Sequence, residues 1–182
     1  GRVQANLESL EPKAESLYQK GRDSYTIGDM ADAELRLRHA LAVNPNHVAA
    51  RLLLGRIHLA RDNYAEAVSV IESAYSSDPA AARSDLISAL ITLADSQDSE
   101  DEQWQTLNKA LRIDPNQPLI LEKRAIILNI WAKKAIKDGD YQVALNAYEQ
   151  LGDAAGLSAG RGKIRRRLLV SRLPGVSRIL SK

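Results

Sequence analysis

The chain contains no cysteine and no phenylalanine, and both absences narrow its chemistry. Without cysteine the protein forms no disulfide and has no thiolate to act as a nucleophile or a metal ligand. Because aromatic residues make up only 4% of the sequence, the core must be built from leucine, isoleucine, valine and alanine, which suits closely packed helices. The lack of thiols fits a reducing compartment and no signal peptide is visible, so we predict a cytoplasmic location.

Long apolar runs are also missing, and acidic residues are missing from one end. The longest apolar stretches, such as residues 125–128, are far shorter than the ~20 residues that span a bilayer. Residues 161–182 contain eight Lys or Arg and no acidic residue. Residues 1–160 contain all 23 acidic residues and 17 Lys or Arg, a net charge of −6. The C-terminal segment is therefore chemically distinct from the rest of the chain.

Three similar phrases, each closed by a proline, give the sequence a period. Pro45, Pro79 and Pro115 end these phrases, at spacings of 34 and then 36 residues. A fixed period of this size is typical of repeat arrays, in which each unit buries its apolar face only by stacking on its neighbours. The period therefore favours a binding scaffold over an enzyme.

A second signature precedes the proline in three places, at residues 28–33, 62–67 and 139–144. Its first residue is Gly or Asp, which we expect to end one helix in the left-handed conformation. Its second residue is Asp or Asn, which we expect to cap the next helix. Its last residue is an alanine, small enough to let two helices approach closely. The signature predicts pairs of helices joined by tight turns.

These residues resemble the tetratricopeptide repeat (TPR) family over about residues 12–151. The matching positions are Gly21, Gly28, Ala33, Ala40 and Pro45 in the first unit and Leu54, Gly55, Tyr64, Ala67, Ala74 and Pro79 in the second. The resemblance implies an all-α, right-handed α-solenoid of about four TPR-like helix pairs, with an extra N-terminal helix and a basic C-terminal helix. We expect repeat units at about 12–45, 46–79, 80–115 and 116–151.

The segments outside the array are predicted separately. Residues 1–11 form an N-terminal helix or linker, and residues 152–182 form a basic capping helix and tail. The helices are expected near 3–10, 13–27, 30–43, 47–61, 64–76, 80–95, 100–113, 118–137, 141–151 and 154–172.

The resemblance also implies a concave groove lined by the first helix of each unit. The predicted partner-binding residues are Tyr18, Arg22 and Tyr25, then Leu52, Arg56 and Leu59, then Arg83, Leu86 and Leu90. Spacings of three and four residues place each set on one side of its helix. Such a surface suits another protein that presents an acidic amphipathic helix or an extended segment, with Arg22 and Arg56 pairing to acids. Two other readings stay open: these leucines pack on each other, or the chain's own tail fills the groove.

The basic tail is a second candidate, and its cations are Lys163, Arg165, Arg166, Arg167 and Arg172. It is interpreted first as a cap over the last repeat, because solenoids need such caps for solubility. A partner-binding role, an anchor to anionic membrane or nucleic acid, and self-assembly through the tail or a solenoid end are the alternatives.

Nothing in the sequence indicates catalysis or a cofactor. His39, His47 and His58 have no histidine or carboxylate at metal-ligand spacing. The acidic loop 95–102 lacks the spacing and central glycine of a calcium loop, and Ser99 with Glu102 is interpreted as a capping box. We therefore predict a non-enzymatic protein–protein interaction scaffold without cofactor or metal.

Overall fold

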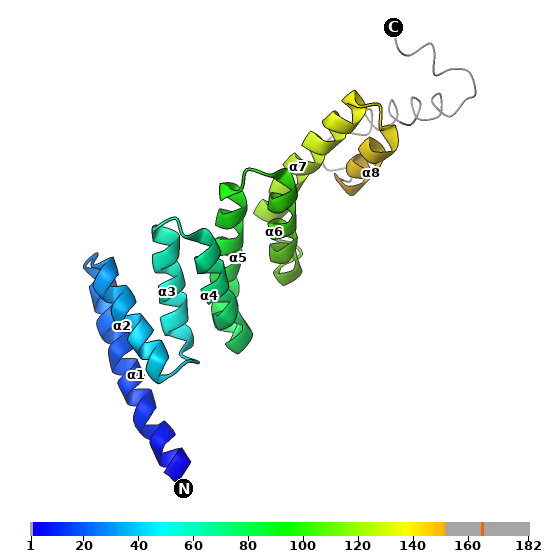
Figure 1. The fold of residues 1–182 in the computed structure, drawn as a ribbon. Coiled ribbons are helices and arrows are strands. Elements are labelled where there is room, and N and C mark those ends of the chain that lie inside the picture. The colour runs from blue at the N-terminus through cyan, green and yellow to red at the C-terminus, as the bar shows by residue number, and fades with distance from the viewer. Residues whose placement is uncertain (1, 152–164, 166–182) are drawn as a thin grey trace, which may run out of the picture. The chain divides into compact units, whose positions relative to one another are not determined.

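In the computed structural model, which describes residues 2–151 and Arg165, the described chain forms eight α-helices and no strand (Figure 1). The helices are α1 (Arg2–Thr26), α2 (Met30–Val43), α3 (Val48–Ala60), α4 (Tyr64–Ser77), α5 (Pro79–Ser96), α6 (Glu100–Ile113), α7 (Pro118–Lys137) and α8 (Tyr141–Leu151). They belong to two compact units that divide between Pro115 and Asn116. The predicted all-α architecture of four helix pairs is confirmed.

Three-residue turns join the two helices of each pair, and three of the four turns contain a residue with positive φ. These residues are Gly28 (φ 86°), Asp62 (φ 60°) and Gly139 (φ 79°). They are the positions at which the sequence predicts a left-handed residue, and this prediction is confirmed. Aspartate occupies such a conformation more readily than most residues with a side chain.

The predicted helix caps are only partly present. The Asp29 side chain accepts a hydrogen bond from the backbone N–H of Asp32 at 3.0 Å, as expected for a cap of α2. Asn63 precedes α4 but its side chain makes no capping bond, so that prediction is wrong. The capping box of Ser99 and Glu102 is also wrong, because the Ser99 side chain makes no capping bond. Acidic residues in the first turn of α6 face the positive end of the helix dipole instead.

Helix α1 runs through Pro12 without a break, which corrects the prediction of separate helices at 3–10 and 13–27. A proline inside a helix loses one backbone hydrogen bond, but its fixed φ is close to the helical value. The segment 1–11 is therefore neither a linker nor a separate helix over its described residues: it forms the first part of α1.

The core of the first unit is aliphatic, as the composition predicts. One cluster joins α2 and α3 through Ala33, Leu37, Ala40, Ala50, Leu53, Leu54 and Ile57. The second unit packs α7 on α8, where Ile127, Leu128 and Ala144 are among the buried residues. Among all described buried hydrophobic residues, Tyr148 is the one aromatic. Small alanines at the helix crossings let the backbones approach closely.

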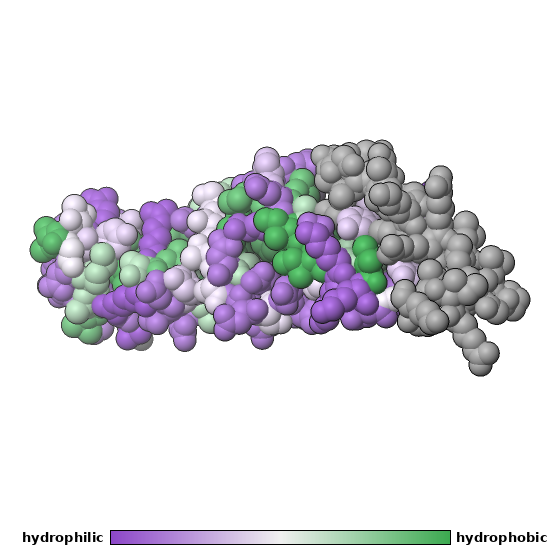
Figure 2. All heavy atoms as spheres, turned by 90° about the horizontal axis from the view of Figure 1, so that it is seen from above, coloured by the Kyte–Doolittle hydropathy of each residue, from purple (hydrophilic) through white to green (hydrophobic). Residues whose placement is uncertain are grey.

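The described surface is mixed in polarity, and polar residues predominate on the face shown in Figure 2. None of the described helices is long and apolar enough to cross a bilayer. The predicted helix 154–172 and the cap and tail at 152–182 lie outside the described residues apart from Arg165. The Arg165 guanidinium lies 3.1 Å from the Glu149 carboxylate of α8, and both side chains are exposed.

Candidate binding site

Three residues line one side of α1. Tyr18, Arg22 and Tyr25 follow each other at spacings of four and three residues, which places them on the same side of the helix. Both tyrosines are half-buried and pack against the α2–α3 core cluster, whereas Arg22 is exposed. The tyrosines are thus held by the core, and the cation between them faces solvent.

Helix α3 repeats the same spacing with Leu52, Arg56 and Leu59. Both leucines are half-buried and Arg56 is exposed. Tyr18 and Tyr25 lie close enough to the Arg56 guanidinium to add to the upward shift of its pKa, so the two sets of residues adjoin. We call the surface formed by these six residues the α1–α3 face.

Arg56 is already paired within the chain. Its Nε and Nη2 atoms donate to the two carboxylate oxygens of Asp85 on α5, at 3.0 and 2.9 Å. The hydrogen bond to Asp85 raises the pKa of Arg56, and burial opposes this in part. The expectation that Arg56 pairs with a partner's acid stays a prediction, and such an acid would have to share Arg56 with Asp85 or displace it. Arg22 makes no ion pair with a described residue.

The third predicted set, on α5, does not form part of this face. Leu86 and Leu90 are only 2% and 1% exposed, so they belong to the core and not to an open groove. Arg83 donates to the backbone carbonyl of Ile113 at the end of α6, at 2.8 Å. Asp85, one position before the predicted leucine, is a residue of α5 that contacts α3. Helix α5 starts after a single connecting residue, whereas four residues connect α2 to α3.

A histidine that the sequence did not assign to the site borders the α1–α3 face. His47 stacks at a tilt on Tyr18, with 5.0 Å between ring centroids. Its Nδ1 accepts from the Ala50 N–H at 3.2 Å, so its Nε2 carries the proton that is donated to Glu15 at 3.1 Å. Hydrogen bonds from Gln19 and then His47 lower the pKa of Glu15. The sequence shows that His47 lies just before a helix, but it gives no sign of the bond to Glu15, which is 32 residues away.

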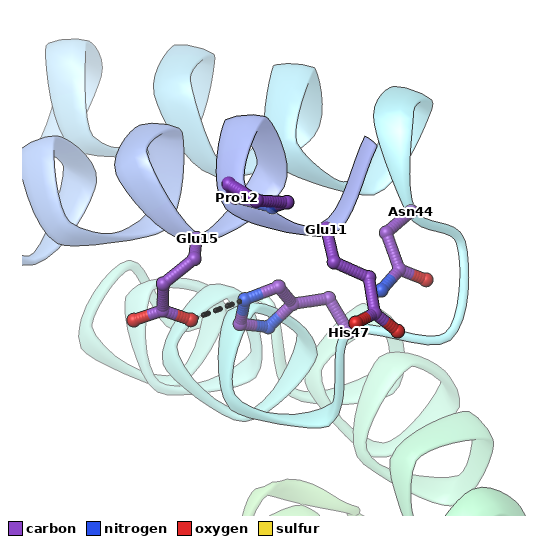
Figure 3. A pocket seen from close by; sticks show the side chains of 5 residues that line it. All are labelled: Glu11, Pro12, Glu15, Asn44 and His47. Carbon is purple, nitrogen blue, oxygen red and sulfur yellow. Dashed lines mark hydrogen bonds and ion pairs between the residues drawn. The ribbon is translucent and has the colours of Figure 1, made fainter. Parts of the chain in front are cut away.

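The Glu15–His47 pair forms one wall of a shallow pocket (Figure 3). Glu11, Pro12 and Glu15 come from α1, whereas Asn44 and His47 come from the connection between α2 and α3. No group of three or more potential metal ligands lies together among the described residues. The pocket therefore offers two carboxylates and an imidazole for hydrogen bonds at the edge of an aromatic and aliphatic surface.

Comparison with known families identifies one match that spans most of the chain. The family described as the cytochrome c-type biogenesis protein H TPR domain matches residues 2–156. Families of TPR type generally mediate protein–protein interactions and are typically non-catalytic. A comparison with curated proteins finds no match.

Several solved structures are similar to this chain at low sequence identity. The crystal structure of MamA protein has 18% identity and a TM-score of 0.48, and the match covers 86% of this chain and 88% of that one. A thermophilic TPR protein from Thermus thermophilus has 16% identity and a TM-score of 0.45, with 86% and 99% covered. A TPR protein from Parabacteroides merdae has 20% identity and a TM-score of 0.47, with 87% and 60% covered.

Proposed function

The chain belongs to the family of the cytochrome c-type biogenesis protein H TPR domain, and from this premise we propose that it is a non-enzymatic binding module in cytochrome c biogenesis. The module holds a helical or extended segment of a partner polypeptide on the α1–α3 face. The described residues give no support to the alternative in which the basic tail anchors the module to a membrane or nucleic acid.

The observation that carries this proposal is the position of Arg22. It is an exposed cation between two tyrosines that the core holds in place, and the half-buried Leu52 and Leu59 lie on the adjoining helix. Aromatic and aliphatic side chains around one charged group are typical of sites that anchor a peptide. Because Asp85 already neutralises Arg56, the face offers one cation for a partner's carboxylate instead of two.

The family description ties this module to cytochrome c, so we propose that the bound segment belongs to a cytochrome c polypeptide. Its recognition elements are one carboxylate for Arg22 and apolar side chains for Tyr18, Tyr25 and Leu52. A segment that is helical or extended presents such groups at regular spacing along the face.

The test compares two substitutions on opposite sides of α1. Labelled peptides that tile a cytochrome c of the source organism are titrated against the full chain, and binding is followed by fluorescence anisotropy. Arg22→Glu should weaken binding of the recognised peptide about tenfold or more, because it replaces attraction by repulsion. Lys13→Glu makes the same charge change nine residues away, on the opposite side of the helix, and should leave the affinity unchanged.

Either of two results would overturn this proposal. One is that no cytochrome c peptide binds the wild-type chain. The other is that Arg22→Glu and Lys13→Glu weaken binding equally, which would indicate a general effect of charge. Circular dichroism of both variants checks that they remain folded.

The family assignment also changes the proposed location. Proteins of this family are periplasmic, so we propose a periplasmic location in place of the cytoplasmic one that the composition predicts. A chain without cysteine forms no disulfide in either compartment, so its composition does not oppose this change. Fractionation of source cells, followed by detection of the protein with a specific antibody, distinguishes the two compartments.

A further inference from the structure

A second hollow lies between α4 and α6, with α5 as its floor. Its volume is about 480 Å³, within the range of sites that hold a peptide side chain or a small ligand. The residues that matter for its chemistry are Glu72 and Tyr75 from α4, Leu86 and Leu90 from α5, and Lys109 and Arg112 from α6. We call it the outer pocket. It shares no lining residue with the proposed α1–α3 face.

The outer pocket is lined by both apolar and polar side chains. Leu86 and Leu90 form the floor and are almost fully buried. Tyr75 of α4 and Ile113 of α6 are half-buried and also line the pocket. An apolar side chain inserted between these residues would be removed from water on several sides, which is the main source of affinity in such contacts.

The rim of the outer pocket is charged, with cations in excess. Lys109 and Arg112 are three residues apart on α6, so they lie on the same side of that helix. Both are exposed, and no ion pair joins either of them to a carboxylate of the described chain. Arg112 lies in the last turn of α6, where a cation interacts favourably with the negative end of the helix dipole. This interaction explains Arg112 but not Lys109. Glu72 is the one acidic residue among those that line the pocket.

From this combination we infer that the outer pocket binds a short acidic segment of a partner protein. One apolar side chain of the segment lies over Leu86 and Leu90, and its carboxylates face Lys109 and Arg112. The chain's own residues 161–182 are a poor occupant, because they contain eight cations and no acid. Nucleic acid suits the two cations but neither the apolar floor nor Glu72.

The probe for this inference is a fluorescent peptide in which aspartate and glutamate alternate with leucine. It is titrated against the full chain at low salt and compared with the same peptide carrying asparagine and glutamine in place of the acids. The acidic peptide should bind, and Lys109→Glu with Arg112→Glu should weaken its binding about tenfold or more. The amide peptide should bind the wild type correspondingly more weakly. Lys109 and Arg112 are both exposed, so we expect the double variant to stay folded.

The matched control is Lys134→Glu with Lys137→Glu. These residues are also exposed, also three apart and also in the last turns of a helix, so the charge change is the same. This control should leave binding of the acidic peptide unchanged. The inference is wrong if the peptide fails to bind, or if Lys109→Glu with Arg112→Glu has no more effect than this control. The second result would place the peptide on the basic tail or on the α1–α3 face, where Arg22→Glu would then weaken its binding.

A second copy of this chain is the remaining occupant, and sedimentation of the full chain tests it. A partner-protein site predicts a wild-type mass that does not depend on concentration. Self-association that disappears in the Lys109→Glu, Arg112→Glu variant would instead assign the outer pocket to contacts between copies. That outcome would overturn the inference and leave the proposed function of the α1–α3 face untouched.

Discussion

Two glycines occupy the same position in consecutive repeats but have different surroundings. A Cβ atom at Gly55 would lie 2.4 Å from Cγ1 and 2.8 Å from Cδ1 of the fully buried Ile71. A Cβ atom at Gly21 would lie 3.1 Å from Cγ and 3.2 Å from Cδ2 of Leu37. Both glycines allow the first helix of a repeat to approach the second, but α3 and α4 are closer than a side chain would permit.

We therefore expect Gly55→Ala to destabilise the protein by about 1–3 kcal/mol, the usual cost of overpacking a core. Gly21→Ala is the matched control. Its neighbour has to move only a few tenths of an ångström, and alanine gains about 1 kcal/mol of helix propensity, so its net effect should stay within about 1 kcal/mol. Chemical denaturation measures both changes.

A double variant strengthens this comparison. Ile71→Ala removes both atoms that the new Cβ would strike, so the cost of Gly55→Ala should largely disappear in that background. If Gly21→Ala proves as costly as Gly55→Ala, or if Ile71→Ala brings no relief, the close approach of α3 and α4 is wrong.

At this scale the sequence predicts what depends on local conformation. Left-handed residues at Gly28 and Asp62 follow from the turn signature, because few residue types tolerate that conformation. The bond between His47 and Glu15 joins residues 32 positions apart, and no local rule predicts it. Asn63 has a residue type that favours capping, but the end of α4 is exposed and water can satisfy its backbone donors.

At the scale of helices, α3 and α5 are joined by a charged pair. Asp85 binds Arg56 through two hydrogen bonds, and its carboxylate is only 18% exposed. The Arg56 side chain is 52% exposed, so water screens part of the attraction. The bidentate geometry fixes the orientation of the guanidinium more firmly than a single contact would. We infer that the pair sets the direction of Arg56 on the α1–α3 face.

The strength of this pair can be measured with a double-mutant cycle. Asp85→Asn, Arg56→Met and their combination should show a coupling energy of about 0.2–1 kcal/mol, as for other partly exposed pairs. High salt should reduce it. A coupling of zero at low salt would mean that the pair does not hold α3 and α5 together in solution.

The same pair shows where the prediction from sequence failed for α5. Helix α3 begins at Val48, one residue from the predicted start, whereas α1 extends back to Arg2 through the predicted break at Pro12. Helix α5 begins at Pro79, capped by Asp78, which is also the last residue associated with α4. Asp85 of α5 binds Arg56 of α3, whereas the neighbouring Leu86, which was predicted to line the groove, is buried. Most helix bounds were predictable from the turn signature and the period, but the side of α5 that contacts α3 was not.

At the scale of the whole molecule, the division between Pro115 and Asn116 predicts independent folding of the first unit. Residues 1–115 contain three helix pairs, and about three repeats are needed to bury a continuous core. A protein of residues 1–115 should therefore unfold cooperatively when heated, as measured by circular dichroism. Residues 116–182 contain one described helix pair and should show no comparable transition.

A fragment 1–115 without a cooperative transition would contradict this division. If it folds, it retains both the α1–α3 face and the outer pocket, because all of their residues precede position 115. Repeat number and helix class were predictable from period and turn signature at this scale. The side chains that a repeat presents to a partner were less predictable, because the sequence alone does not distinguish a buried leucine from an exposed one.

The most direct test of the central claim is to map peptide binding on the protein by nuclear magnetic resonance. The isotope-labelled full chain is titrated with the cytochrome c peptide that binds best, and changes in backbone amide shifts are followed. We predict saturable changes clustered in α1 and α3 around Tyr18, Arg22 and Arg56. Saturable changes confined to other helices, with α1 and α3 unaffected, would contradict the assignment of the α1–α3 face as the binding site.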